Sequence, residues 1–310
     1  MKILVTGGAG YIGSILVPEL LEAGYSVTVL DSFIYRQSSL NHVCVNSRLE
    51  IVDGDIRDQS LIKKLIPKHD AVVPLAALVG APLCDRDPFA ATSVNRDSVF
   101  SMLKTLSANQ WLLMPTTNSA YGTGGIGNFC DENSPLKPIS RYAIDKVEIE
   151  SAVMERENAI SFRLATVFGV SPRMRLDLLV NDFTYRAVHD RFIVLFEPSF
   201  KRNYIHVRDV ARAFMFSLQN FPRMKSNIYN VGLSDANISK RELCDVIKKQ
   251  IPDFAVFEDK IKSDPDQRNY IVSNSKIEAA GFRTSFTLQQ GIAELIKGFC
   301  MFNARPHRNA

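Results

Sequence analysis

In the first half of the chain, short apolar runs alternate with longer segments in which apolar positions recur every three or four residues. The first run predicts a buried strand over residues 1–7, followed by an amphipathic helix over 11–24 and a second strand over 25–31. A strand, a helix and a strand in this order form a βαβ unit. This half of the chain is therefore expected to contain a parallel sheet.

The alternation continues to about residue 170 and then loosens. Further strands are predicted at 49–55, 70–77, 111–117 and 161–169, and helices at 61–69, 89–107 and 141–157. Beyond them the pattern predicts a helix at 181–190, a strand pair around 191–196 and 203–207, and helices at 207–219 and 239–251.

These patterns predict an α/β fold, with a Rossmann-type doubly wound parallel sheet and a smaller α+β C-terminal substrate lobe. We expect residues 1–170 to form the first domain, with 201–230 returning to it. Residues 171–302 are expected to form the second lobe, and 303–310 a loose tail.

Composition narrows the class of protein. The 310 residues carry a net charge of +4, and the basic residues are dispersed, which favours small anionic partners over nucleic acid. The five cysteines are an odd number with no CxxC pair, so we expect neither a disulfide framework nor a metal site, and a reducing cytoplasm. The longest apolar stretch is broken by proline and glycine, which argues against a membrane span.

The motif GGAGYIG lies directly after the first strand and opens the first helix. Its glycines, Gly7, Gly10 and Gly13, allow a tight turn, the approach of a pyrophosphate and close helix packing. Tyr11 and Ile12 stand at the helix N-terminus, where free N–H groups favour an anion. A glycine pattern alone also fits a plain turn, but the strand, turn and helix together predict a dinucleotide site.

Two acidic positions extend this prediction. Asp31 closes the second strand at the distance expected for an acid that binds the adenosine ribose, and it would repel a 2′-phosphate. NAD is therefore favoured over NADP, although Arg36 is near enough in sequence to leave NADP open. Asp55 and Ile56 follow the third strand, where they either contact the adenine or cap the strand end.

Tyr142 and Lys146 are four residues apart, so a helix places them on one face. Such a pair also arises by chance on a solvated helix. Beside a nicotinamide, however, Tyr142 can take the proton of a sugar hydroxyl, provided that Lys146 and the cationic ring favour its phenolate. Thr117 ends the strand over 111–117 and can orient the hydroxyl; its alternative role is in a β-turn.

Together these motifs resemble the extended short-chain dehydrogenase/reductase family that acts on nucleotide sugars. The resemblance covers almost the whole chain and includes residues 53–58, Leu75, Ala76 and Ala77, and residues 202–211. It implies NAD as cofactor, with the 75–77 segment beside it, a nucleotide diphosphate-sugar as substrate, and a homodimer or higher homo-oligomer. Thr117, Tyr142 and Lys146 occupy the positions of the catalytic triad.

The resemblance also predicts substrate contacts. Members that dehydrate sugars carry acids just after the triad Ser/Thr, whereas this chain has Asn118 and Ser119, which cannot act as an acid or a base at neutral pH. We therefore disfavour 4,6-dehydration and expect both residues to contact the sugar. Val79 and Gly80, in a small-residue loop, are expected to lie beside the sugar.

In the second lobe, the resemblance assigns Asn181 to the diphosphate, Arg202 to the nucleotide and Arg268 to phosphate. Arg173 and Arg175, in the motif SPRMR, are further candidates. For any single surface arginine, the alternative interpretation is a solvated charge.

Two other reactive side chains have simpler interpretations. Cys84 could be an acid or a base, but a buried inert thiol is the favoured interpretation. His206 is expected to pack and hydrogen-bond in a strand instead of binding metal.

Within the family, residues 74–84, 117–122, 162–187 and 200–210 resemble bacterial GDP-D-glycero-α-D-manno-heptose 4-dehydrogenases of capsular polysaccharide biosynthesis. This resemblance implies oxidation at C4 to the 4-keto sugar, with α-ketoglutarate as a second substrate that reoxidises the cofactor. A nucleotide-sugar 4-epimerase with the same triad is an alternative. A non-catalytic NAD-binding regulator is a further alternative, disfavoured because both the tyrosine and the lysine are present.

Overall fold

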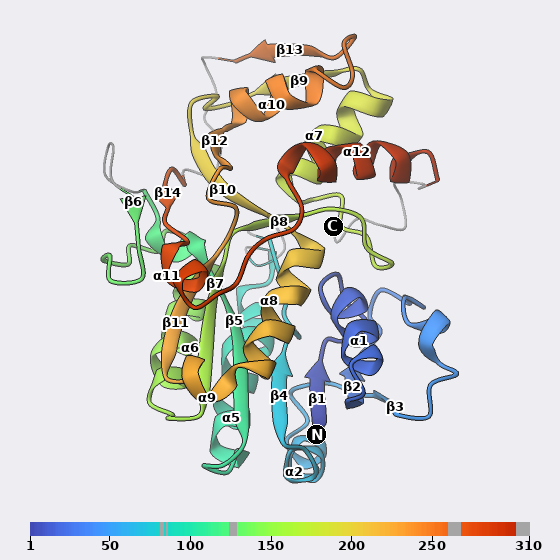
Figure 1. Cartoon of the computed structure of the whole chain (residues 1–310), viewed down its shortest axis with the longest axis vertical. Helices are drawn as coiled ribbons and strands as arrows, with labels where there is room; N and C mark the ends of the chain where they lie inside the picture. Colours follow the sequence, from blue (N-terminus) through green and yellow to red (C-terminus); the bar gives the residue numbers. More distant parts are fainter. Residues whose placement is uncertain (81–83, 85, 124–128, 260–267, 302–310) are drawn as a thin grey trace.

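The computed structural model describes residues 1–80, 84, 86–123, 129–259 and 268–301. The tail expected at 303–310 lies outside them. The described chain forms a larger lobe around one sheet and a smaller lobe above the carboxyl ends of its strands (Figure 1).

The larger lobe contains a seven-stranded sheet in the order β3, β2, β1, β4, β5, β7, β11, in which every neighbouring pair is parallel. Its strands are β1 (Lys2–Thr6), β2 (Ser26–Asp31), β3 (Leu49–Asp53), β4 (Ala71–Pro74), β5 (Trp111–Thr117), β7 (Ala159–Leu164) and β11 (Asn227–Val231). The predicted doubly wound α/β fold is confirmed.

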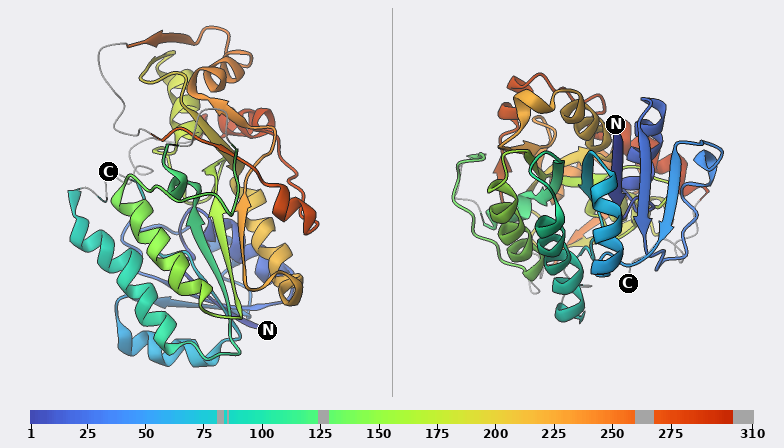
Figure 2. Two further views of the ribbon diagram at one scale, coloured as in Figure 1. Left: turned by 90° about the vertical axis from the view of Figure 1, so that its left-hand side faces the viewer. Right: turned by 90° about the horizontal axis from the view of Figure 1, so that it is seen from below.

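Helices cover both faces of this sheet, as Figure 2 shows from the side. Successive residues of a strand point to opposite faces, so Ile3 and Val5 belong to one hydrophobic core and Leu4 to the other. The first core includes residues of α1 (Gly13–Glu22) and α8 (Val207–Gln219). The second includes residues of α2 (Gln59–Leu65), α5 (Ser98–Thr105) and α6 (Arg141–Met154). The first core also continues into the smaller lobe.

The smaller lobe is built from short strands and helices. A three-stranded sheet has the order β12, β10, β8, and two parallel pairs join β13 to β9 and β14 to β6. The strands are β6 (Phe129–Cys130), β8 (Thr166–Phe168), β9 (Phe192–Leu195), β10 (Lys201–His206), β12 (Asn237–Ser239), β13 (Ala255–Glu258) and β14 (Ile271–Val272). The helices are α7 (Leu179–His189), α10 (Lys240–Lys248), α11 (Ser275–Ala279) and α12 (Leu288–Phe299).

The chain passes between the lobes more than once. After β10 it returns to the large sheet, where α8 packs against α1 and β11 pairs with β7. The short helix α9 (Phe221–Met224) connects them. Of the region expected to return, 201–230, the first six residues are an exception, because β10 lies in the three-stranded sheet of the smaller lobe.

The predicted pairing of the strands around 191–196 and 203–207 is wrong. Both strands exist, but β9 pairs with β13, and β10 pairs with β8 and β12. A period-two pattern shows which side chains of a strand are buried, but it does not identify the neighbouring strand. The partner of β9 is β13, which lies some sixty residues further along the chain.

The helix predicted over 89–107 is interrupted. It consists of α4 (Pro88–Thr92), a π-helical turn η3 (Ser93–Asp97) and α5. The turn directs the buried Asn95 toward the loop after β4: Asn95 Oδ1 accepts from Leu78 N at 2.7 Å and its Nδ2 donates to Leu78 O at 2.9 Å. The interruption thus fixes the loop that follows β4.

No helix within the described ranges is both long and apolar enough to cross a membrane.

Candidate active site

The turn between β1 and α1 can exist only with glycine at two positions. Gly7 has φ +68°, and a Cβ there would lie 2.6 Å from Ala76 N, in the loop after β4. A Cβ on Gly13 would lie 2.5 Å from Gly8 O. Gly10 closes the turn by donating its N–H to Gly7 O at 3.0 Å. The glycines therefore bring the start of α1 close to the carboxyl edge of the sheet.

Tyr11 ties this turn to the smaller lobe. Its hydroxyl donates to Gly169 O at 2.7 Å and accepts from Asn181 Nδ2 at 3.3 Å, and burial raises its pKa above the ordinary range. The Tyr11 side chain is thus held inside the protein. Ile12 immediately precedes α1, where the main chain of residues 11–13 forms the N-terminal end of the helix.

Asp31 ends β2 beside the same turn and is almost fully buried. Its carboxylate accepts from Ala9 N at 3.0 Å, Phe33 N at 3.0 Å and Gln37 Nε2 at 3.2 Å. Burial raises the pKa of Asp31, and these hydrogen bonds oppose the rise. The acid thereby fixes the glycine turn as well as the strand end.

Asp55 and Ile56 follow β3 and face different surroundings. Asp55 forms an ion pair with Arg57 at 2.5 Å, and the hydrogen bond from Arg57 lowers the pKa of Asp55. Ile56 is buried in the core beneath α2. The structure thus supplies the Asp55 carboxylate with a local partner; a contact with adenine stays a prediction.

The loop after β4 carries the next candidates. Leu75 N donates to Thr6 O at 2.9 Å, and Ala76 N approaches Thr6 Oγ1 at 3.4 Å, so Leu75–Ala77 run beside the glycine turn. Val79 and Gly80 lie further along, and residues 81–82 of the same loop are outside the described part of the chain.

Tyr142 and Lys146 lie in the first two turns of α6, which Ser140 caps through a 3.3 Å bond from Ala143 N. Lys146 is buried, and its Nζ donates to Pro115 O in β5 at 3.1 Å and lies 5.9 Å from the centre of the Tyr142 ring. Thr117 is two residues further along β5, at its end. The bond from Lys146 therefore joins the helix face that carries Tyr142 to β5, two residues before Thr117 at the edge of the sheet.

Burial dominates the protonation of this pair. It lowers the pKa of Lys146 to about 8, against the opposing effect of Asp145. Burial raises the pKa of Tyr142 to about 12, while Arg175 is the strongest influence in the opposite direction. The expectation that Lys146 favours the phenolate is therefore not met by the protein alone, where the net shift is upward because the ring is desolvated.

Thr117 begins a chain of hydroxyl contacts. Its Oγ1 accepts from Ser119 N at 3.1 Å and donates to Ser119 Oγ at 3.0 Å. Ser119 Oγ also accepts a hydrogen bond from Arg268 Nη1. The residue assigned to phosphate is therefore connected through one hydroxyl to the triad threonine.

Asn118 differs from its neighbours. Its side chain is fully buried, yet neither its Oδ1 nor its Nδ2 has a hydrogen-bond partner among the described residues. An unpaired buried amide is costly, so such a group usually marks a place where a ligand or water completes the bonding.

The two other predicted substrate residues are placed differently. Arg202 is buried on β10, where it donates to Lys201 O at 2.9 Å and lies 5.5 Å from the centre of the Tyr270 ring. Asn181 accepts from Gly169 N at 3.0 Å and donates to Arg175 O at 2.8 Å in addition to its contact with Tyr11. Its amide thus holds the loop after β8, and binding a diphosphate would require it to exchange a bond.

Arg175 and Arg173 also approach the site, from the loop between β8 and α7. Arg175 forms an ion pair with Asp177, and a side chain at Gly80 would come within 4.0 Å of its Nη2. Arg173 lies over the Tyr35 ring at 4.4 Å. The motif SPRMR was the only sequence signal for Arg175, and spacing alone does not reveal that it influences Tyr142.

Cys84 is buried and its thiol donates to Leu78 O at 3.3 Å. His206 is buried against Phe168 and Phe286; its Nδ1 accepts from Arg208 N, and its Nε2 donates to Glu294 Oε2 at 2.6 Å. Within the described ranges, no group of three or more His, Cys, Asp or Glu side chains could hold a metal ion.

The parallel sheet, the glycine turn with Asp31, and the Thr, Tyr and Lys cluster define a dinucleotide-dependent enzyme of the Rossmann class. Residues 3–232 match the model of the NAD dependent epimerase/dehydratase family, and the chain belongs to this family. Its cofactor is NAD, and its activity is of the nucleotide-sugar epimerase/dehydratase type.

The relatives are distant, but the similarity extends over most of the chain. A UDP-glucose 4-epimerase from Corynebacterium glutamicum is 26% identical, with 79% of each protein covered. A human dTDP-D-glucose 4,6-dehydratase is 26% identical, covering 96% of this chain and 89% of the relative. The crystal structure of Thermus thermophilus UDP-glucose 4-epimerase in complex with NAD superimposes with a TM-score of 0.84 at 24% identity, covering 97% of this chain and 99% of that one.

Proposed function

We propose that this protein oxidises a nucleotide diphosphate-sugar at C4 of the sugar, with Thr117, Tyr142 and Lys146 as its catalytic residues. The observation that carries the proposal is the position of α6: its first turns place Tyr142 and the buried Lys146 beside the end of β5, where Thr117 stands. A phenol, an ammonium and a hydroxyl at the carboxyl edge of a parallel sheet are the groups that a proton-coupled hydride transfer needs.

The residues around the glycine turn fit NAD. Gly7 and Gly13 leave no space for a side chain because the protein backbone itself approaches, and Gly10 lies between them at the start of α1. We assign the pyrophosphate to the main chain of residues 10–13, the ribose to Asp31, and the 75–77 loop and Lys146 to the nicotinamide end. NAD held by these residues would supply the acceptor for the hydride removed from the sugar.

The acid and base work falls to Tyr142. It removes the proton of the sugar hydroxyl, and the Thr117 hydroxyl forms a hydrogen bond with the same sugar oxygen. Because burial raises the pKa of Tyr142 to about 12, the phenolate needs positive charge nearby. Lys146 holds its ammonium between the ring and Pro115 O, and Arg175 lowers the pKa of Tyr142 from the opposite lobe.

The groups next to Thr117 support oxidation without elimination. Asn118 and Ser119 offer an amide and a hydroxyl, neither of which can protonate a leaving hydroxyl at neutral pH. The buried, unpaired Asn118 amide is well suited to bind a sugar hydroxyl instead. Arg268 and Arg202 are the proposed diphosphate and nucleotide contacts, since arginine binds phosphate oxygens in a bidentate manner.

For the substrate itself we propose GDP-D-glycero-α-D-manno-heptose, on the sequence resemblance described above, with α-ketoglutarate as second substrate and the 4-keto sugar as product. UDP-glucose and dTDP-glucose, named for the relatives, are the competing substrates to test.

A second candidate is a 4-epimerase. Relatives from Corynebacterium glutamicum and Thermus thermophilus are UDP-glucose 4-epimerases, and the same triad would serve that reaction. The difference is whether the keto sugar leaves or turns within the site before hydride returns.

The experiment is to incubate the purified protein with GDP-heptose, UDP-glucose and dTDP-glucose in separate reactions, with and without α-ketoglutarate. Accumulating NADH or 4-keto sugar supports the dehydrogenase. A new C4 isomer without accumulated NADH supports the epimerase. Loss of the C6 hydroxyl would contradict both. If none of a wider panel of sugar nucleotides reacts, the proposal is overturned.

A further inference from the structure

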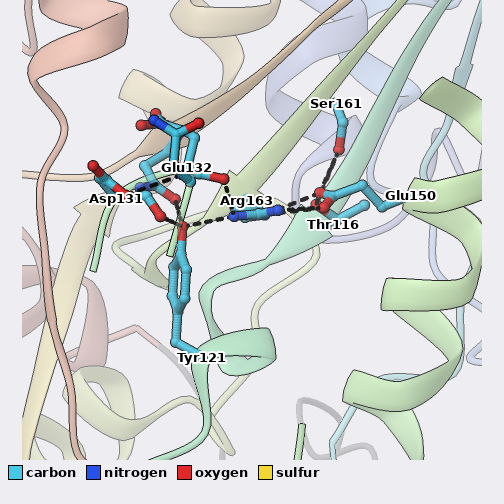
Figure 3. A network of polar contacts seen from close by, with 9 residues as sticks. Thr116, Tyr121, Asp131, Glu132, Glu150, Ser161 and Arg163 are labelled. Carbon is cyan, nitrogen blue, oxygen red and sulfur yellow. Dashed lines mark hydrogen bonds and ion pairs between the residues drawn. The ribbon is translucent and has the colours of Figure 1, made fainter. Parts of the chain in front are cut away.

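The face of α6 that carries Tyr142 and Lys146 also carries a buried acid. Glu150 follows Lys146 by four residues and is buried against the sheet beneath the site. Figure 3 shows its carboxylate between Thr116, Ser161 and Arg163. A buried carboxylate is retained only with compensating partners, so its contacts are informative.

Both carboxylate oxygens of Glu150 accept hydrogen bonds, and Arg163 Nε is shared between them, at 3.0 Å from Oε1 and 3.2 Å from Oε2. Oε1 accepts from Arg163 Nη2 at 2.7 Å and Nε at 3.0 Å. Oε2 accepts from Thr116 Oγ1 at 2.8 Å and Ser161 Oγ at 2.9 Å. Thr116 directly precedes Thr117, so α6 is bonded to the residue next to the triad hydroxyl.

Arg163 extends the network from Glu150 to Tyr121, at the far end of the segment 116–121. Its Nη1 donates to Tyr121 Oη at 2.9 Å and to Glu132 O at 3.2 Å. Tyr121 Oη lies 2.9 Å from Asp131 O and 2.8 Å from Asn230 Oδ1. Tyr121 ends the 3-10 helix η4 (Asn118–Tyr121), which begins directly after Thr117.

The segment 116–121 is therefore held at both ends by one buried ion pair. Thr116 is bonded to Glu150 on α6, and Tyr121 to Arg163 on β7. A third bond runs from Lys146 Nζ on α6 to Pro115 O, directly before this segment. Between these bonds lie Thr117, Asn118 and Ser119, the residues proposed to contact the sugar.

We infer that Glu150 and Arg163 are positioning residues that fix the Thr117 hydroxyl relative to Tyr142 by holding both ends of the 116–121 segment. This inference rests on the proposed catalytic roles of Thr117 and Tyr142. A displacement of about 1 Å in such a pair can lower the rate about 100-fold, even when folding and binding are preserved. The network thus contributes to kcat through geometry and never touches the substrate.

The decisive comparison is Thr116→Val against Ser161→Ala. Each variant removes one hydroxyl donor from the same oxygen of Glu150, and each leaves the Glu150–Arg163 pair intact. Only Thr116 adjoins Thr117. We expect T116V to lower kcat at least about tenfold, with KM and NAD affinity nearly unchanged, and S161A to have a smaller effect on kcat at a similar loss of Tm.

Thr116→Ser, which keeps the hydroxyl, should restore most of kcat. Glu150→Gln should lower kcat further than T116V, although it leaves the buried Arg163 charge without its counter-charge and will also lower Tm. Equal kcat losses in T116V and S161A, or a loss in T116V that T116S does not repair, would overturn the inference.

A crystal structure of T116V with NAD gives a readout that needs no turnover. We expect the Thr117 hydroxyl to move relative to Tyr142 in T116V and to keep its place in S161A. An unmoved Thr117 contradicts the inference even if the wild-type protein proves inert. Inert wild-type protein with a displaced Thr117 in T116V would instead overturn the proposed function alone.

Discussion

The two walls of the site are built in different ways. On the catalytic wall, Thr117, Tyr142 and Lys146 come from one strand and one helix of the large sheet, and main-chain and buried polar bonds fix them. On the substrate wall, Arg202 lies on a strand of the small sheet, whereas Arg268 precedes β14. The proposed catalytic residues are therefore tied to the fold itself, while the proposed substrate contacts come from segments that are distant in sequence.

This difference predicts that changes on the first wall affect kcat and changes on the second affect KM. The largest effect should come from Tyr142→Phe. Removing the hydroxyl deletes the proposed base, so kcat should fall by about 100- to 10,000-fold. NAD binding, measured by calorimetry, should persist. Tyr25→Phe, just before β2 at the opposite edge of the sheet, is the control and should retain full activity; comparable turnover in the two variants would remove Tyr142 from the mechanism.

On the second wall, Arg268→Met should raise KM for the sugar nucleotide by about 10- to 100-fold, because a charge-assisted bond to phosphate is lost. Steady-state kinetics measures the change. Since Arg268 also donates to Ser119 Oγ, a modest fall in kcat is expected as well. Arg223→Met, at an exposed arginine on α9, is the control. A large fall in kcat at constant KM would show that the two walls are not functionally separate.

The pH dependence connects the walls, because Arg175 of the smaller lobe influences Tyr142. The reactive tyrosine is unprotonated and burial raises its pKa to about 12, so kcat/KM for oxidation should rise with pH from about 6 to about 8. Above pH 8 the rise should flatten, because Lys146, whose pKa burial lowers to about 8, loses its ammonium charge. Arg175 lowers the pKa of Tyr142. Arg175→Met should therefore raise that pKa, lower activity at neutral pH and move the rising limb to higher pH. Identical profiles for both proteins would exclude this coupling.

The smallest effect is expected at Asn118. Because its buried amide has no partner among the described residues, Asn118→Ala should leave Tm nearly unchanged and raise KM for the sugar about two- to tenfold. Asn95→Ala offers the contrast, since that buried amide makes two bonds to Leu78 and its loss should lower Tm clearly. A large loss of Tm in N118A would indicate a structural role.

The large sheet could be predicted from the sequence because its signals are local. Short, almost continuously buried apolar runs mark β1 and β2. The glycine motif marks the turn after β1, and Asp31 marks the end of β2. Tyr142 and Lys146 were found by helical spacing, and Thr117 by its position at the end of β5. Each inference needed only a few neighbouring residues and the geometry of a parallel sheet.

The rest depends on contacts between distant segments. The partner of β9 is β13, which no pattern in either strand specifies. The upward shift in the pKa of Tyr142 arises from burial by the assembled protein, which the spacing of Tyr142 and Lys146 does not reveal. Likewise, Glu150 looks like an ordinary charged helical residue until β7 places Arg163 beside it.

The route of the chain has a consequence for anyone who wishes to transplant specificity from one enzyme to another. Because β11 completes the large sheet, and α8 packs on it, after the chain has already built β8 to β10, the lobe proposed to bind the substrate is not contiguous in sequence. A chimera would have to exchange residues 129–130, 166–206 and 233–301 together while keeping 207–231 from the host. A single crossover would instead leave the host sheet with a foreign edge strand and mismatch the core that both lobes share.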